Sequence, residues 1–224
     1  MIVRIEAGDR VYPDAFRELL GGNAPLCLYG LGETALLNHC FVGLICSVRC
    51  PGSLILKTLD AVRLLRDAGV PVMGGFHAPM ERECLDLLLR GRAPVVYCAA
   101  RGLTGLRLGK AARAALHEKR LLALSPFPEQ VRRTDAAGAV LRNDLVAALS
   151  RVLLVPHAVS GGKVWATASA CLERGQRVLT FADEANTELI ASGAFPVDTD
   201  TVVSALAFPG GSDSSLQGPA DGRS

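Results

Sequence analysis

The sequence predicts an α/β fold built on a doubly wound, mostly parallel β-sheet. Two observations lead to this prediction. Short apolar runs occur without a polar residue at every second position, as in strands that are buried on both faces of a parallel sheet. These runs alternate with longer segments in which apolar residues recur at helical spacing. Such alternation is typical of helices that cover both faces of one sheet.

Seven segments carry the strand pattern, and each has the usual length of a strand. In chain order they are Leu26–Tyr29, Phe41–Val48, Val70–Gly74, Pro94–Ala99, Leu121–Ser125, Val152–Val155 and Arg177–Phe181.

Five segments between these strands carry the helical pattern. They are Leu54–Arg66, Met80–Leu89, Leu108–Glu118, Asp144–Leu149 and Val164–Glu173. Pro79 suits the first turn of its helix, and Gly69 and Gly175 suit the ends of theirs.

The domain organisation is predicted from shifts in composition along the chain. Residues 1–24 form an N-terminal lead-in that contains a short helix, Asp14–Leu20. Residues 25–207 form one α/β domain. Residues 208–224 read FPGGSDSSLQGPADGRS from Phe208 onward, a composition that predicts a disordered tail.

Composition and charge exclude several classes of protein. Half of the 224 residues are apolar, which excludes global disorder, and the formal net charge of +2 is far from that of a histone-like protein. Charges at Arg4, Glu6 and Asp9 leave no room for a signal peptide, and no apolar run is long enough to span a bilayer. We therefore expect a cytoplasmic protein with no membrane contact. The seven cysteines include no CxxC pair, so reduced structural thiols are favoured over a metal site.

Two glycine motifs match nucleotide-binding patterns only in part. Gly30–Ala35 reads G-x-G-x-x-A after a strand, but no acidic residue follows at the expected distance, so we interpret it as a glycine-containing turn. A P-loop around Gly162-Lys163 would need glycine at His157 and a hydroxyl at Val164. The sequence thus does not support a P-loop nucleotidase.

Glycine, serine and positive charge follow three of the predicted strands. Gly74 and Gly75 end one strand, Ser160-Gly161-Gly162 follows another, and Ser47 and Arg49 close a third. Glycines let a backbone approach a ligand closely, and helix N-termini offer N–H groups to an anion. Because ligands of open α/β sheets bind at the carboxyl edge, we expect a site for a phosphate-rich ligand there. The cations proposed for it are Arg49, Arg101, Arg142 and Lys163, with His77 as a further contact.

Catalytic chemistry is not indicated. The four histidines and the scattered acidic residues have no spacing that predicts a triad or a metal site, so we expect no catalytic residue, metal or cofactor. Aromatic platforms for bases are scarce. Phe76, Tyr97 and Trp165 are the candidates, although core packing accounts for all three.

Several motifs resemble the DprA/Smf family of DNA-processing proteins. The family's "VGSR" strand end is similar to Cys46–Arg49, and its "SGxARGID" turn is similar to Gly74–Glu81. Its "RNRIIAGLS" motif resembles Arg142–Ser150. Its "SGSxxTA" resembles the stretch from Ser160 to Ala168, and its "GTNxLIxxGA" resembles Asn186–Ala194. The order and spacing of these motifs carry the resemblance over about 180 residues.

The resemblance implies an extended Rossmann fold that binds single-stranded DNA without catalysis. It implies a role in DNA uptake, natural transformation and recombination, in which a homodimer loads a RecA-type recombinase. With the residues proposed above, the predicted DNA- or phosphate-binding set is Ser47, Arg49, Gly74, Gly75, His77, Arg101, Arg142, Asn143, Ser160, Gly161, Gly162 and Lys163. The chain departs from the family at Ala78, Pro79 and Asp144, and it ends without the family's frequent winged-helix module.

Two other functions use the same crevice. The first alternative is a sensor domain that binds a nucleotide or a nucleotide-derived ligand. The second is a hydrolase similar to the phosphoribohydrolases, whose "PGGxGTxxE" loop would fall at Ser160–Ala168. Ala168 stands near the position where that chemistry needs a glutamate, so the hydrolase ranks last.

Overall fold

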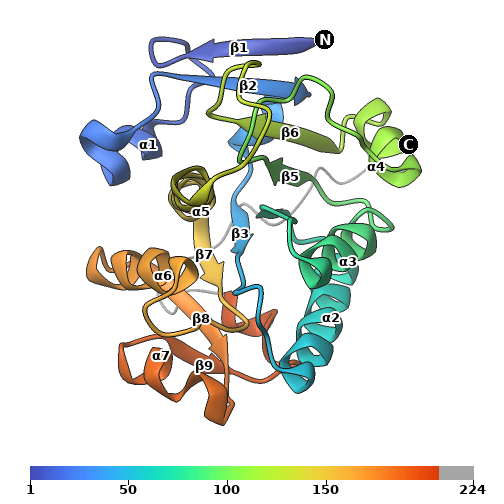
Figure 1. Ribbon diagram of the computed structural model, residues 1–224. Helices are drawn as coiled ribbons and strands as arrows, with labels where there is room; N and C mark the ends of the chain where they lie inside the picture. Colours follow the sequence, from blue (N-terminus) through green and yellow to red (C-terminus); the bar gives the residue numbers. More distant parts are fainter. Residues whose placement is uncertain (207–224) are drawn as a thin grey trace, which may run out of the picture.

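The computed structural model describes residues 1–206, which form a doubly wound α/β fold around one twisted sheet (Figure 1). The strands are β1 (Ile2–Glu6), β2 (Cys27–Gly32), β3 (Phe41–Leu44), β4 (Val72–Gly74), β5 (Val95–Cys98), β6 (Leu121–Ser125), β7 (Ser150–Leu154), β8 (Arg177–Phe181) and β9 (Phe195–Val197). The α-helices are α1 (Asp14–Leu20), α2 (Gly52–Asp67), α3 (Pro79–Leu88), α4 (Lys110–His117), α5 (Ala136–Ala148), α6 (Lys163–Glu173) and α7 (Thr187–Ala191). Short 3-10 helices are η1 (Gly21–Asn23), η2 (Thr34–Asn38), η3 (Glu184–Asn186) and η4 (Ser204–Leu206). The predicted tail lies outside the described residues.

The described strands form a single sheet in the order β1-β2-β6-β5-β4-β3-β7-β8-β9. From β6 to β9 all neighbours are parallel, whereas β1 and β2 add an antiparallel edge. The chain starts the parallel part at β3, proceeds outward to β6, and then returns to the other side of β3 at β7. The order of the strands therefore reverses between β3 and β7. In open α/β sheets, this is where ligands bind.

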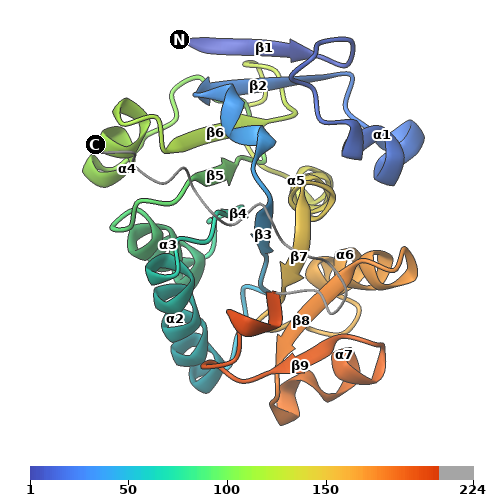
Figure 2. The ribbon, with the colours of Figure 1, turned by 180° about the vertical axis from the view of Figure 1, so that it is seen from behind.

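Helices cover both faces of the sheet. Apolar side chains of α2, α3 and α4 form one buried cluster with the sheet, and those of α1, α5, α6 and α7 form another. Figures 1 and 2 show these two groups of helices on opposite sides of the strands. The predicted α/β class, with a mostly parallel sheet, is confirmed. No helix of residues 1–206 is long and apolar enough to cross a membrane.

The predicted start of α5 was wrong. The sequence analysis places this helix at Asp144–Leu149, but it begins eight residues earlier, at Ala136. The Asp135 carboxylate accepts a hydrogen bond of 2.6 Å from the Gly138 N–H and caps the helix there. The small residues of the first turns hide the apolar stripe that would reveal a helix, so the periodicity becomes visible only further along.

The interpretation of Gly30 and Gly32 as part of a turn was also wrong. Both glycines lie inside β2, which continues to Gly32. Gly32 has a φ of +121°, and a Cβ at this position would overlap the Leu121 carbonyl of β6. The glycine pattern therefore reflects close contact between two strands. The edge strands β1 and β9 were not predicted either. β1 mixes apolar residues with the charged Arg4 and Glu6, and β9 is only three residues long.

The packing of β3 against β7 leads to a prediction about stability. Gly43 lies in β3 where an added Cβ would overlap Ser150 Oγ and lie 2.8 Å from Leu153 Cδ1. Because both neighbours belong to the core, we expect Gly43→Ala to lower the free energy of unfolding by about 1–3 kcal/mol in urea titrations. Gly52→Ala is the matched control, since nothing lies within 4 Å of its Cβ, and we expect a change within about 0.5 kcal/mol. An equal effect of both substitutions would contradict the packing described for Gly43.

Candidate functional site

A groove of about 1350 Å³ lies at the carboxyl edge of the parallel strands. Its walls come from the loop after β3, the turn between β4 and α3, the loop after β5, and the N-terminal parts of α5 and α6. These segments are far apart in the sequence. They meet because the strands before them are parallel and end at the same edge of the sheet. The groove therefore lies at the carboxyl edge, where the sequence analysis expects a ligand site, and it includes the loops on both sides of the point where the strand order reverses.

The structure brings most of the predicted site residues together. Eight of them line the groove, namely Ser47, Arg49, Gly75, His77, Arg101, Arg142, Asn143 and Lys163. Gly74, Ser160, Gly161 and Gly162 are not among the lining residues. Two further cations, Arg82 and Arg107, line the groove and were missed by sequence reasoning. The position of Arg82 in the first turn of a helix that follows a strand end was the signal that could have revealed it.

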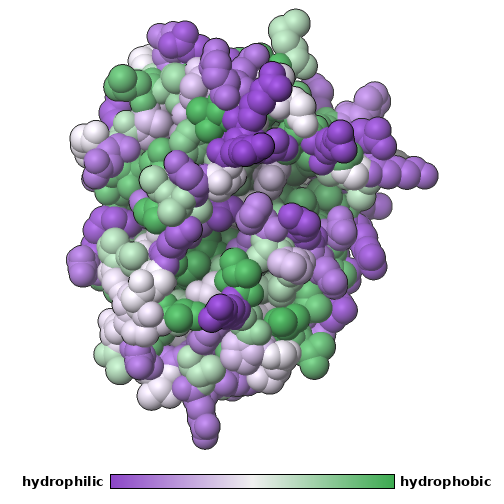
Figure 3. Space-filling model, viewed as in Figure 1, coloured by the Kyte–Doolittle hydropathy of each residue, from purple (hydrophilic) through white to green (hydrophobic). Residues whose placement is uncertain are grey.

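The cations of the groove have no acidic partners among residues 1–206. Arg49, Arg82, Arg101, Arg107, Arg142 and Lys163 line it, and within residues 1–206 none of them has a carboxylate within 4 Å. The ion pairs found in this part of the chain lie elsewhere on the molecule. Figure 3 shows hydrophilic side chains gathered over the upper right of this face, above β5, β6 and α4. The groove thus carries an excess of positive charge that a ligand can neutralise.

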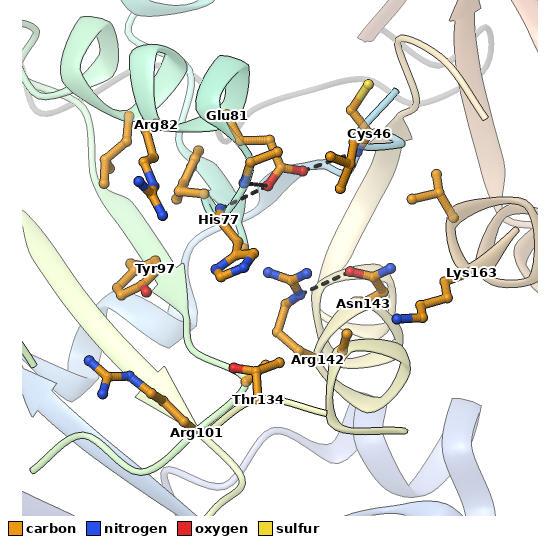
Figure 4. A pocket seen from close by; sticks show the side chains of 18 of the residues that line it. Cys46, His77, Glu81, Arg82, Tyr97, Arg101, Thr134, Arg142, Asn143 and Lys163 are labelled. Atoms are coloured by element: carbon orange, nitrogen blue, oxygen red, sulfur yellow. Dashed lines mark hydrogen bonds between the residues drawn. The ribbon is translucent and has the colours of Figure 1, made fainter. Parts of the chain in front are cut away.

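Arg142 lies at the centre of this set. Its side chain leaves α5 and is only 8% exposed, and its Nε–H donates a 2.9 Å hydrogen bond to Asn143 Oδ1. The guanidinium lies against Gly75, where any Cβ would overlap it. Figure 4 shows the guanidinium reaching from α5 toward the turn that carries His77. A buried cation without a counter-ion is costly, and an anionic ligand in the groove would offset that cost.

The turn between β4 and α3 uses its backbone N–H groups internally. Glu81, in the first turn of α3, accepts hydrogen bonds from the N–H groups of Cys46 at 3.1 Å and His77 at 2.9 Å. A longer contact of 3.4 Å comes from the N–H of Ala78. Phe76 has a φ of +43°, which is unusual for a residue with a side chain and marks a sharply bent backbone. The glycines before it permit the close approach of Arg142 and of the strand end of β3.

The loops after β3 and β7 are tied to each other. The Ser47 N–H donates a 3.0 Å hydrogen bond to the His157 carbonyl, and Ser47 Oγ accepts one of 3.0 Å from the Val159 N–H. The Ser160-Gly161-Gly162 segment forms the tight turn before α6, with a φ of +70° at Gly161. Ser47 and the glycine turn thus hold the two loops in place at the reversal point, and Lys163 follows the turn as the first residue of α6.

Of the three aromatic candidates, only two line the groove. Tyr97 is partly exposed there, and its ring centroid lies 6.4 Å from that of the buried Phe76. Burial raises the pKa of the Tyr97 hydroxyl, while Arg101 and other nearby arginines oppose this shift. Trp165 faces a separate hollow beside Leu172 and Ser192. Tyr97 is therefore the aromatic ring that the groove presents to a ligand.

Asp144, which replaces an arginine of the family motif, does not face the groove. Its carboxylate accepts a 2.9 Å hydrogen bond from Thr167 Oγ1 of α6, and burial raises its pKa. The change from arginine to aspartate at position 144 therefore lies between α5 and α6 and not in the groove. Ala78 is buried at the start of α3, and Pro79 occupies the first position of that helix.

Thiols and acidic residues form no metal centre in the described part of the chain. All seven cysteines are free, and residues 1–206 contain no cluster of three potential protein ligands. A hydrogen bond between the thiols of Cys46 and Cys50 raises the pKa of Cys46, which is also buried, and lowers that of Cys50. Burial raises the pKa of Cys98 to about 12. Ala168, at the position where a phosphoribohydrolase would need glutamate, is fully buried in the core.

Comparisons with known proteins agree with this architecture. A search of curated proteins found no match. DNA processing protein A from Streptococcus pneumoniae has a similar structure, with a TM-score of 0.77 and 19% identity over 92% of this chain and 75% of that one. DNA processing protein A from Helicobacter pylori, whose structure is described as giving insight into its single-stranded DNA binding mode, has a TM-score of 0.75. It is 19% identical to this chain over 92% of this chain and 95% of its own. A molybdenum cofactor binding protein from Rippkaea orientalis is less similar, with a TM-score of 0.55 and 10% identity over 75% of this chain and 96% of that one. The family model described as DNA recombination-mediator protein A matches residues 4–206, and the chain therefore belongs to the DprA family.

Proposed function

We propose that the groove binds single-stranded DNA through the phosphates of its backbone. The observation that carries the proposal is the set of six groove cations without carboxylate partners among residues 1–206. A strand that runs along the groove would bring a phosphate to each of several cations in turn, and release of the counter-ions of the DNA would favour binding. Tyr97 gives one base a ring to stack on.

The cellular role proposed for the chain follows from its family. We propose that it acts in the cytoplasm in DNA uptake, natural transformation and recombination, where it passes the bound strand to a RecA-type recombinase. We further propose that it works as a homodimer and without catalysis. Family membership and the H. pylori relative described as binding single-stranded DNA support this role.

The first prediction of the proposed function concerns salt. Affinity for a labelled single-stranded oligonucleotide, measured by fluorescence anisotropy, should fall linearly on a log–log plot as salt increases. If each of the six cations contacted one phosphate, the slope would be about −4, so we expect a value between about −2 and −4. Tight binding of a free nucleotide, combined with weak binding of the oligonucleotide at low salt, would contradict the proposal and favour a nucleotide sensor.

The second prediction concerns Arg142. We expect Arg142→Ala to weaken oligonucleotide binding about 10- to 100-fold, which corresponds to about 1.5–3 kcal/mol for a hydrogen bond to a charged group. The salt slope should become shallower by about 0.7–1, because one phosphate contact is lost. Arg63→Ala is the control, since Arg63 is an arginine of α2 outside the groove that pairs with Asp60. Equal losses in both variants would show that only net charge matters.

The third prediction concerns Gly75. A Cβ at Gly75 would displace the guanidinium of Arg142 without removing its charge. We therefore expect Gly75→Ala to weaken oligonucleotide binding about 10-fold while the salt slope changes little. Gly109→Ala is the matched control, since Gly109 also lines the groove but has nothing within 4 Å of an added Cβ. Unchanged affinity in Gly75→Ala would show that the position of the guanidinium does not matter.

A further inference from the structure

Glu81 occupies the place where an α/β fold can receive a phosphate. Glu81 is only 4% exposed and lines the groove at the N-terminus of α3. Backbone N–H groups at helix N-termini bind anions, and such sites lie at the carboxyl ends of parallel strands. Here the carboxylate of the chain itself accepts the N–H groups of Cys46, His77 and Ala78. The seat for an anion is therefore already filled.

The carboxylate of Glu81 is held like a bound anion. No Lys, Arg or His side chain of residues 1–206 lies within 4 Å of it, so its three hydrogen bonds to the backbone are what hold it in place. Two of these donors, His77 and Ala78, belong to the same turn as Gly75, against which Arg142 lies. Figure 4 shows the side chains of Glu81 and Arg142 reaching toward this turn from α3 and α5. Arg142 and the fixed carboxylate of Glu81 thus both line the groove near this turn, without forming an ion pair with each other.

The charges of Arg142 and Glu81 act differently on two kinds of phosphate. A phosphodiester inside a DNA strand carries one negative charge, whereas a phosphomonoester at the end of a nucleotide carries about −1.5 to −2 at pH 7. Both are attracted to Arg142. Repulsion from Glu81 grows with the charge of the phosphate and is strong where the surroundings are partly buried. The helix N-terminus that would otherwise stabilise the extra charge is not available.

We propose that Glu81 makes the groove selective for internal phosphodiesters of a strand over phosphomonoesters, so that free nucleotides do not occupy the site. The inference rests on the proposed binding of single-stranded DNA at this groove and names the kind of phosphate that the groove accepts. Glu81 is a specificity-determining residue that acts by occupying the anion seat, while Arg142 supplies the attraction.

The test compares two small probes that differ in one charge. Thymidine 5′-phosphate is the monoester, and its methyl ester is the diester. Binding of each to the whole protein is measured by titration calorimetry at pH 7.5 and low salt. Wild-type protein should bind the diester at least as tightly as the monoester. Cations alone would give the opposite order, because they favour the more highly charged ligand.

Glu81→Ala opens the anion seat and should reverse the preference. We expect the variant to bind the monoester about 10-fold or more tightly than wild-type protein does, with little change for the diester. Glu83→Ala is the matched control, because it removes an exposed carboxylate from the same helix, and it should behave as wild type. Glu81→Gln removes the charge but leaves a side chain of nearly the same size at the helix N-terminus, so it tests the repulsion alone. If Glu81→Ala does not fold, we expect Glu81→Gln to bind the monoester more tightly than wild-type protein, with a smaller gain than an open helix N-terminus would give.

Three results would overturn the proposal. They are a preference of wild-type protein for the monoester as large as that of Glu81→Ala, equal effects of the Glu81 and Glu83 substitutions, and no monoester binding by the Glu81 variants. The preference between the two probes is measured without an oligonucleotide. Failure of wild-type protein to bind single-stranded DNA would therefore overturn the proposed function separately.

Discussion

The buried guanidinium of Arg142 is the constraint on which the groove depends. A cation that is nine-tenths buried and has no carboxylate within 4 Å among the described residues is tolerated only where its free N–H groups reach water or an anion. Gly75 must lack a side chain because the guanidinium lies against it, and Asn143 orients the guanidinium through Nε. The turn after β4, the first half of α5 and the open groove are therefore parts of one arrangement.

Two loops at the reversal point of the sheet keep this arrangement rigid. Backbone and side-chain hydrogen bonds join Ser47 to the loop after β7. The buried Asn186 amide donates hydrogen bonds to the Pro156 carbonyl after β7 and to the Phe181 carbonyl at the end of β8. Glu81 adds a bond from α3 to the end of β3. Most of these contacts join a side chain to a backbone group, so they depend on the identity of Ser47, Asn186 and Glu81 and on the register of the strands that carry the backbone partners.

Sequence reasoning succeeded where a pattern is local and failed where contacts between distant segments decide. Continuous apolar runs predicted the central strands because strands buried on both faces contain few polar residues. The start of α5 was missed because small residues hide its apolar stripe. Gly30 and Gly32 were assigned to a turn because a glycine pattern does not reveal that the backbone of Leu121, in another strand, lies against Gly32. All four predicted cations line the groove, since strand ends share one edge, but Arg82 and Arg107 were missed.

The amino-acid sequence by itself determined the α/β class, the order of the motifs and the family to which they belong, because these depend on residue type and spacing. Only the tertiary structure decided what each glycine and each charge does. Gly75 and Arg142 are distant in sequence, and only the folded structure shows that the missing side chain of Gly75 leaves room for the guanidinium of Arg142. Likewise, Asp144 turns toward α6 while Glu81 fills the helix N-terminus. Pairing and burial of charges depend on distances across the fold, which no local pattern records.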